Sequence, residues 1–65
     1  MTVCDFYKIV KDFQLVKIVD INTPTNELYR GIFKNVPDRL INLYIGHIEI
    51  ETCKCCGTQF IKIYV

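Results

Sequence analysis

Two runs of alternating polar and apolar residues constrain the fold of this chain more than any other feature. The runs are His47–Thr52 and Thr58–Val65, and Cys53–Gly57 separates them. Period-two alternation gives a strand one apolar and one polar face. A glycine between two such runs allows the positive φ that a reversing turn requires. The sequence therefore predicts a β-hairpin over residues 47–65.

The chain is short and rich in apolar side chains. Its 65 residues allow one domain, residues 1–65, near the lower size limit for folding without a disulfide or a metal. Hydrophobic residues make up 51% of the chain, which is more than so short a chain is expected to cover by itself. We therefore expect a homodimer or a tightly bound protein partner.

The charges are almost balanced, with eight Lys and Arg against seven Asp and Glu, and the two signs are interleaved. Sequence-independent nucleic-acid binding relies on clustered Lys and Arg, so a nucleic-acid partner is not expected. Met1–Asp5 lacks the basic flank and apolar run of a signal peptide, and the apolar runs are too short to cross a bilayer. These features predict a cytoplasmic protein without membrane contact, in which reduced thiols do not form disulfides.

Two segments have the apolar spacing of amphipathic helices. The first is Thr2–Phe13, which opens with a capping-box-like pair, Thr2 and Asp5. The second begins at Pro37, because proline is tolerated in a first helical turn, and ends near Gly46. The side chains expected to face the core are Val3, Phe6, Tyr7, Val10 and Phe13 from the first helix and Leu40, Ile41, Leu43 and Tyr44 from the second.

Two more strands are predicted between these helices. Gln14–Ile21 is dense in β-branched residues, and Glu27–Val36 follows after an Asn/Thr/Pro loop at Asn22–Asn26. Gly31 within the second strand indicates a bulge or the close approach of another group. We expect these two strands to pair as a hairpin.

The predicted order α-β-β-α-β-β gives an α+β fold with a four-stranded, mainly antiparallel sheet and both helices on one face. The other face of the sheet is then expected to be apolar and to need cover. A two-fold dimer could supply that cover by packing sheet against sheet or by pairing edge strands. The uncovered face is expected to carry some of the residues Leu15, Val19, Ile21, Tyr29 and Phe33.

The cysteine cluster carries the most distinctive chemistry in the sequence. Cys53 and Cys56 form a Cys-x-x-Cys-Gly half-site, a spacing that lets two thiolates of one turn reach a single tetrahedral zinc. A structural zinc needs four ligands, and a second half-site is missing. The missing ligands could come from a second copy, or from Cys4 or His47 of the same chain. The alternative is a cysteine-rich turn that binds no metal and leaves the protein without a cofactor.

Catalytic interpretations have little support in the sequence. A redox Cys-x-x-Cys motif normally opens a helix, whose dipole lowers the thiol pKa, whereas this one interrupts two strands. The chain has no serine and no glycine loop for phosphate, and nothing pairs the single histidine, His47, with a cysteine as a dyad. We therefore expect that the protein is not an enzyme, and a small enzyme using Cys56 or His47 is a third hypothesis.

A short helix, Ile/Val-rich strands and the lack of a catalytic motif give the chain an overall build that resembles the small accessory proteins of phages and mobile elements of low-GC bacteria. The resemblance implies binding to a larger protein, in some members as an inhibitor of a host defence system. The leading hypothesis is therefore a non-enzymatic, homodimeric protein that acts by protein–protein binding. The alternative is a zinc-stapled nucleic-acid-binding module that uses Cys53 and Cys56.

Overall fold

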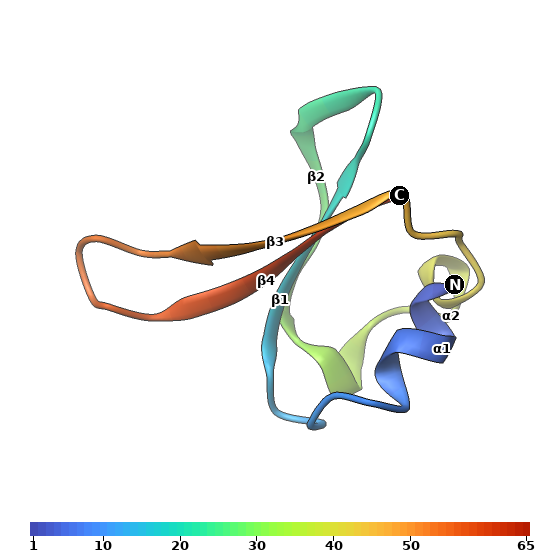
Figure 1. Cartoon of the computed structure of the whole chain (residues 1–65), viewed down its shortest axis with the longest axis horizontal. Helices are drawn as coiled ribbons and strands as arrows, with labels where there is room; N and C mark the ends of the chain where they lie inside the picture. Colours follow the sequence, from blue (N-terminus) through green and yellow to red (C-terminus); the bar gives the residue numbers. More distant parts are fainter.

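Two hairpins and two short helices make up the fold (Figure 1). A computed structural model describes all residues, 1–65. The elements in chain order are α1 (Val3–Tyr7), β1 (Leu15–Asp20), β2 (Thr23–Ile32), the 3₁₀ helix η1 (Phe33–Asn35), α2 (Asp38–Ile41), β3 (His47–Thr52) and β4 (Gln59–Tyr64). The α+β class is confirmed, and so is the hairpin predicted over residues 47–65.

The four strands form one mixed sheet in the order β2-β1-β4-β3. Both hairpins, β1–β2 and β3–β4, are antiparallel. The two inner strands, β1 and β4, are parallel, with Val16 opposite Ile61 and Val19 opposite Tyr64. The mainly antiparallel prediction is thus only partly confirmed, because the last strand enters the sheet beside the first one instead of adding at an edge.

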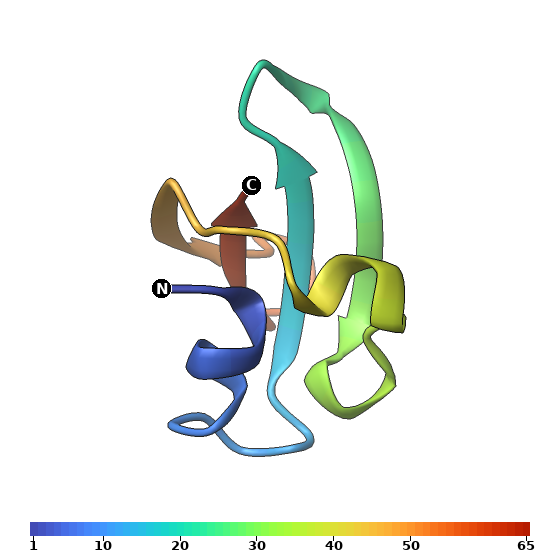
Figure 2. The ribbon, with the colours of Figure 1, turned by 90° about the vertical axis from the view of Figure 1, so that its right-hand side faces the viewer.

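The hydrophobic core lies between the helices and one face of the inner strands. It consists of Val16, Ile18 and Ile63 from the strands together with Val3, Phe33, Val36 and Leu40. Because α1 and α2 both contribute to it, the two helices cover the same face, which Figure 2 shows from the helix side. They cover only part of that face, and the β3–β4 hairpin extends beyond them (Figure 1).

The first helix is shorter than its apolar spacing predicts. The capping box is present, since the Asp5 amide donates to Thr2 Oγ1 at 3.2 Å and the Thr2 amide to Asp5 Oδ2 at 3.1 Å. The helix ends at Tyr7, and the chain turns to enter β1. Phe13, predicted to face the core, is therefore 70% exposed.

The second helix is also shorter than predicted and ends at Ile41. Leu40 is buried as expected, but Leu43 is 38% and Tyr44 77% exposed. The backbone after the helix bonds to the first residues of the chain instead: the Val3 amide donates to the Leu43 carbonyl at 3.0 Å, and the Ile45 amide to that of Met1 at 2.9 Å. These long-range bonds replace the helical ones.

The β1–β2 hairpin has a tighter turn than the predicted loop Asn22–Asn26. Only Ile21 and Asn22 lie between the paired ends, and Pro24 belongs to β2, where an edge strand tolerates its missing amide. The register shifts around Val19, away from Gly31. The close approach expected at Gly31 is confirmed, because a Cβ there would lie 2.9 Å from the Tyr29 hydroxyl.

The prediction of a second, apolar face of the sheet is only partly confirmed: Val19 lies on that face and is buried, but charged side chains surround it. Phe33 leaves the strand, enters the core and is fully buried. Tyr29 also packs against the core. Between the core-facing residues of β1 and β4, the strand alternation places Lys17 and Lys62 on the outer face. Charged side chains therefore occupy the centre of that face. Two such faces packed together would not form the apolar contact expected of a sheet-against-sheet dimer.

Candidate functional site

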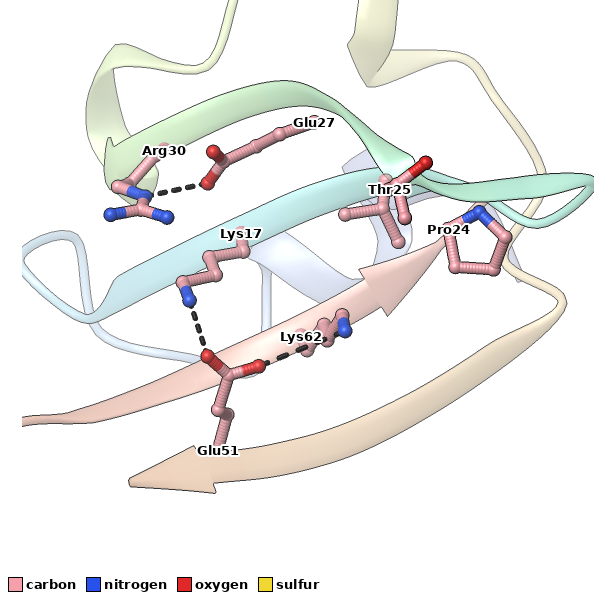
Figure 3. A pocket seen from close by; sticks show the side chains of 8 residues that line it. Lys17, Pro24, Thr25, Glu27, Arg30, Glu51 and Lys62 are labelled. Atoms are coloured by element: carbon pink, nitrogen blue, oxygen red, sulfur yellow. Dashed lines mark hydrogen bonds and ion pairs between the residues drawn. The ribbon is translucent and has the colours of Figure 1, made fainter. Parts of the chain in front are cut away.

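Charged side chains from all four strands gather on the sheet face opposite the helices. We call this the charged face and define it by Lys17, Glu27, Arg30, Glu51 and Lys62 (Figure 3). At its centre, the Glu51 carboxylate forms an ion pair and hydrogen bond with Lys17 and lies 3.7 Å from Lys62 Nζ. One carboxylate of β3 therefore links β1 and β4.

A shallow depression lies beside this ion pair. It encloses about 210 Å³ and is also lined by Val19, Pro24 and Thr25. Within it, Arg30 Nε donates to Glu27 Oε1 at 2.6 Å, along the same strand β2. The charged face thus consists of ion pairs between neighbouring side chains.

Interactions on the charged face favour the ionised forms of Glu51, Arg30 and Lys62. The hydrogen bond from Lys17 lowers the pKa of Glu51, and the hydrogen bond to Glu27 raises the pKa of Arg30. The pKa of Lys62 is raised, first by its interaction with Tyr64 and then by nearby glutamates. General acid–base catalysis works best with a pKa near the working pH, and these shifts move away from neutrality.

The lowered pKa of Glu51 predicts a loss of stability in acid. Its folded-state pKa lies below the unfolded value, so its contribution is present above the unfolded pKa and disappears as the pH falls through the folded one. Urea unfolding at a series of pH values should give a stability that falls below about pH 4.5, and Glu51→Gln should flatten this dependence. Glu27→Gln is the matched control, because its ion pair stays within one strand. An unchanged slope in Glu51→Gln would contradict the prediction.

The outer edge of β3 is the second candidate site. β3 ends the sheet, so its outer backbone groups have no strand partner. Five of its six residues are exposed, among them Ile48 at 36% and Ile50 at 65%. The other edge strand, β2, has Pro24 and an irregular register, features that discourage pairing with further strands. β3 has neither, and we refer to this unpaired border as the β3 edge.

His47 and Glu49 lie on the side of β3 that faces away from Ile48 and Ile50. His47 Nε2 lies 3.0 Å from Glu49 Oε1, and the His47 ring packs against Tyr64 with 5.4 Å between ring centroids. The Tyr64 hydroxyl donates to Glu49 Oε2 at 3.3 Å. The histidine is thus held at the start of β3 by a carboxylate and an aromatic ring.

The cysteine cluster forms the tip of the β3–β4 hairpin, as the sequence predicts. The Gly57 amide donates to the Cys53 carbonyl at 2.8 Å, and the Cys53 amide donates to the Thr58 carbonyl at 2.7 Å. Gly57 has a φ of +71°, which a residue with a side chain adopts at a cost. These bonds close the turn that carries Cys53 and Cys56.

The environment of Cys56 favours its thiolate. Its Sγ lies 3.1 Å from Thr58 Oγ1. Hydrogen bonds from the side chain and backbone of Thr58, followed by the neighbouring thiol of Cys53, lower the pKa of Cys56. A thiolate is the form of cysteine that binds metals and reacts as a nucleophile, and Cys56 is exposed at the tip.

The structure does not gather the other predicted ligands around this pair. His47 begins β3 whereas Cys53 follows its last residue, so the two lie about 20 Å apart along the strand. Cys4 lies in α1, at the helical end of the molecule. No three His, Cys, Asp or Glu side chains are close enough together to hold a metal ion. Cys53 and Cys56 therefore remain a half-site within one chain.

Sequence reasoning missed the charged face. Its signal is the position of Lys17 and Lys62 at alternate places in apolar strands. Their convergence on Glu51 depends on the parallel pairing of β1 with β4, which strand patterns alone do not specify.

Comparisons with known proteins show no relationship: no family model, no curated protein and no solved structure matches the chain. No helix of the structure is long and apolar enough to span a membrane.

Proposed function

We propose that this chain is a non-enzymatic binding protein that pairs its β3 edge with an extended segment of another protein. The observation that carries the proposal is the unprotected edge strand β3, with Ile48 and Ile50 exposed on one side of it. An unpaired edge supplies a row of backbone donors and acceptors for an added strand, and side chains at alternate positions supply specificity.

The existing neighbour of β3 indicates which sequence its open edge would accept. On the closed side, Ile63, Lys62 and Ile61 of β4 lie opposite Ile48, Glu49 and Ile50. Directly opposed residues share a face of the sheet, and apolar and opposite-charge pairs stabilise it. The open edge presents the same three side chains, so its preferred occupant is a strand that alternates aliphatic and basic residues.

A second copy of this chain is a poorer occupant of the β3 edge. In the antiparallel two-fold pairing that sets Ile48 against Ile50, Glu49 faces its own counterpart across the axis. Like charges directly opposite each other destabilise a sheet. In that register the β3 edge therefore favours a different protein over a β3–β3 homodimer.

A synthetic peptide of the preferred pattern tests the proposal directly. A capped heptapeptide with an Ile-Lys-Ile-Lys-Ile centre should shift the β3 amide signals of ¹⁵N-labelled protein and slow their hydrogen exchange. The same peptide with Glu in place of Lys should bind about tenfold more weakly, because it places like charges opposite Glu49. Shifts that avoid β3, or equal binding of both peptides, would reject the proposed edge.

Substitutions at exposed positions test the β3 edge without unfolding the protein. Ile50→Lys removes the more exposed isoleucine and should abolish binding of the basic peptide. Tyr44→Ser is the matched control, since Tyr44 is 77% exposed and lies outside the β3 edge. Equal losses in both variants would contradict a specific role for β3.

The same variants, Ile50→Lys and Tyr44→Ser, test whether a natural partner binds at the β3 edge. The resemblance to phage and mobile-element accessory proteins makes a bacterial defence enzyme the first partner class to try, with inhibition as the readout. A nucleic-acid-binding role has weaker support, because Lys17, Arg30 and Lys62 share the charged face with Glu27 and Glu51. Phosphate binding needs basic groups that are free to replace counterions.

A further inference from the structure

We propose that Cys53 and Cys56 form one half of a tetrathiolate zinc site that a second copy of the chain completes, so that the metal joins two hairpin tips. The proposal rests on the geometry of the turn and not on the β3 edge. It assigns a ligand class, a soft divalent metal, and a partner that contributes half of the site.

The turn already holds two sulfur ligands in place. Its backbone is closed by the 2.8 Å bond from the Gly57 amide to the Cys53 carbonyl and by the 2.7 Å bond from the Cys53 amide to the Thr58 carbonyl. Both bonds use the backbone alone, and neither Cys53 nor Cys56 is in a disulfide; the Cys56 thiol makes one hydrogen bond, to Thr58 Oγ1. Two cysteines of one turn with two residues between them are a common half of a tetrahedral zinc site.

The chain itself supplies no further ligand to this pair. Structural zinc is almost always four-coordinate, yet no three potential ligands of this chain lie together. Cys4 and His47 lie on α1 and at the opposite end of β3. Two more thiolates must therefore come from outside, and an identical turn is the simplest source that gives four equivalent ligands.

The hairpin tip is open to a second copy. Figure 1 shows the β3–β4 hairpin extending away from the helices, with the turn at its far end. A Cβ added to Gly57 would meet no atom within 4 Å, and Cys55 and Cys56 are exposed. Two tips can thus meet without a collision between the helical ends.

The charge of the turn also suits such a site. Four thiolates around one divalent metal leave a net charge of about −2 at the centre. Each turn contributes one exposed lysine, Lys54, so two copies bring two positive charges next to the metal. This offsets the charge that the ligand set introduces.

Cobalt(II) is the probe for the experiment, because thiolate coordination gives it visible and near-ultraviolet bands. Reduced, metal-free protein titrated with cobalt should saturate at one metal per two chains, and light scattering should show a mass twice that of the 7.6 kDa chain. Zinc should displace the cobalt without changing that mass. Saturation at one metal per chain with an unchanged mass, or the absence of a thiolate-to-cobalt band, would overturn the proposal.

Single cysteine variants assign the ligands. Outer-sphere partners alone contribute about 10–100-fold to metal affinity, so Cys53→Ser and Cys56→Ser should each lose at least that much. Cys55→Ser, on the same exposed turn, is the control and should bind as tightly as the parent. Equal loss in Cys55→Ser would reject the assignment. Ile50→Lys should leave cobalt binding intact, which separates failure of this site from failure of the β3 edge.

Discussion

Replacing Phe33 with alanine is expected to leave most of the chain unfolded at room temperature. Phe33 is fully buried and packs against the rings of Phe6 and Tyr7, with centroids 5.9 and 5.1 Å away. Phe-to-Ala changes in a core cost about 3–5 kcal/mol. In so short a chain a single core rarely gives a free energy of unfolding above about 3–5 kcal/mol. The substitution therefore removes nearly all of that stability.

Circular dichroism and urea unfolding measure this loss directly. Phe13→Ala is the matched control, because Phe13 is 70% exposed and contacts Lys34, whose Nζ lies 5.6 Å from the ring centroid. Removing an exposed cation–π contact costs about 0.5–1 kcal/mol, so this variant should stay folded. A cooperative unfolding transition near that of the parent in Phe33→Ala would show that Phe33 does not anchor the core.

Replacing Gly31 with alanine is expected to cause the second-largest loss of stability. Gly31 has a φ of +149°, and an added Cβ would lie 2.9 Å from the Tyr29 hydroxyl. Strained backbone conformations of this kind cost about 1–3 kcal/mol. The tyrosine can move only by giving up its 2.6 Å hydrogen bond to the Ile32 carbonyl, which adds about 1 kcal/mol.

A double-mutant cycle separates the two causes. If contact with the hydroxyl contributes, Gly31→Ala should cost less in a Tyr29→Phe background than in the parent, since contacting residues couple by about 0.5–3 kcal/mol. Gly57→Ala is the reference for backbone strain without a contact, because its φ is +71° and no atom lies near the added Cβ. A coupling energy near zero in the Gly31/Tyr29 cycle would assign the effect to φ alone.

The C-terminal hairpin could be predicted from the sequence because its signals are local. Strict alternation in His47–Thr52 and a glycine at Gly57 define both strands and the turn, and the structure agrees with them within a residue. The position of Cys53 and Cys56 at the tip follows from the same pattern.

The helix lengths could not be predicted, because contacts distant in sequence decide them. Phe13 and Tyr44 continue the apolar spacing of their segments, yet both are exposed. The backbone around Tyr44 pairs with Thr2, and no local propensity signals that pairing. For the same reason the sequence predicted the candidate sites only in part. The charged face depends on the parallel β1–β4 pairing. The cysteine half-site needs further metal ligands from outside one chain.

The placement of β4 has a consequence for the synthesis of the protein. β4 is made last, yet it occupies an inner position between β1 and β3. A nascent chain can close the β1–β2 hairpin early, but one side of β1 stays without a neighbour until the ribosome has added Ile61 and Ile63. Contacts between residues far apart in sequence slow folding and prolong the exposure of aggregation-prone strand edges. Until β4 is made, β1 therefore presents an unpaired edge that can pair with the wrong strand.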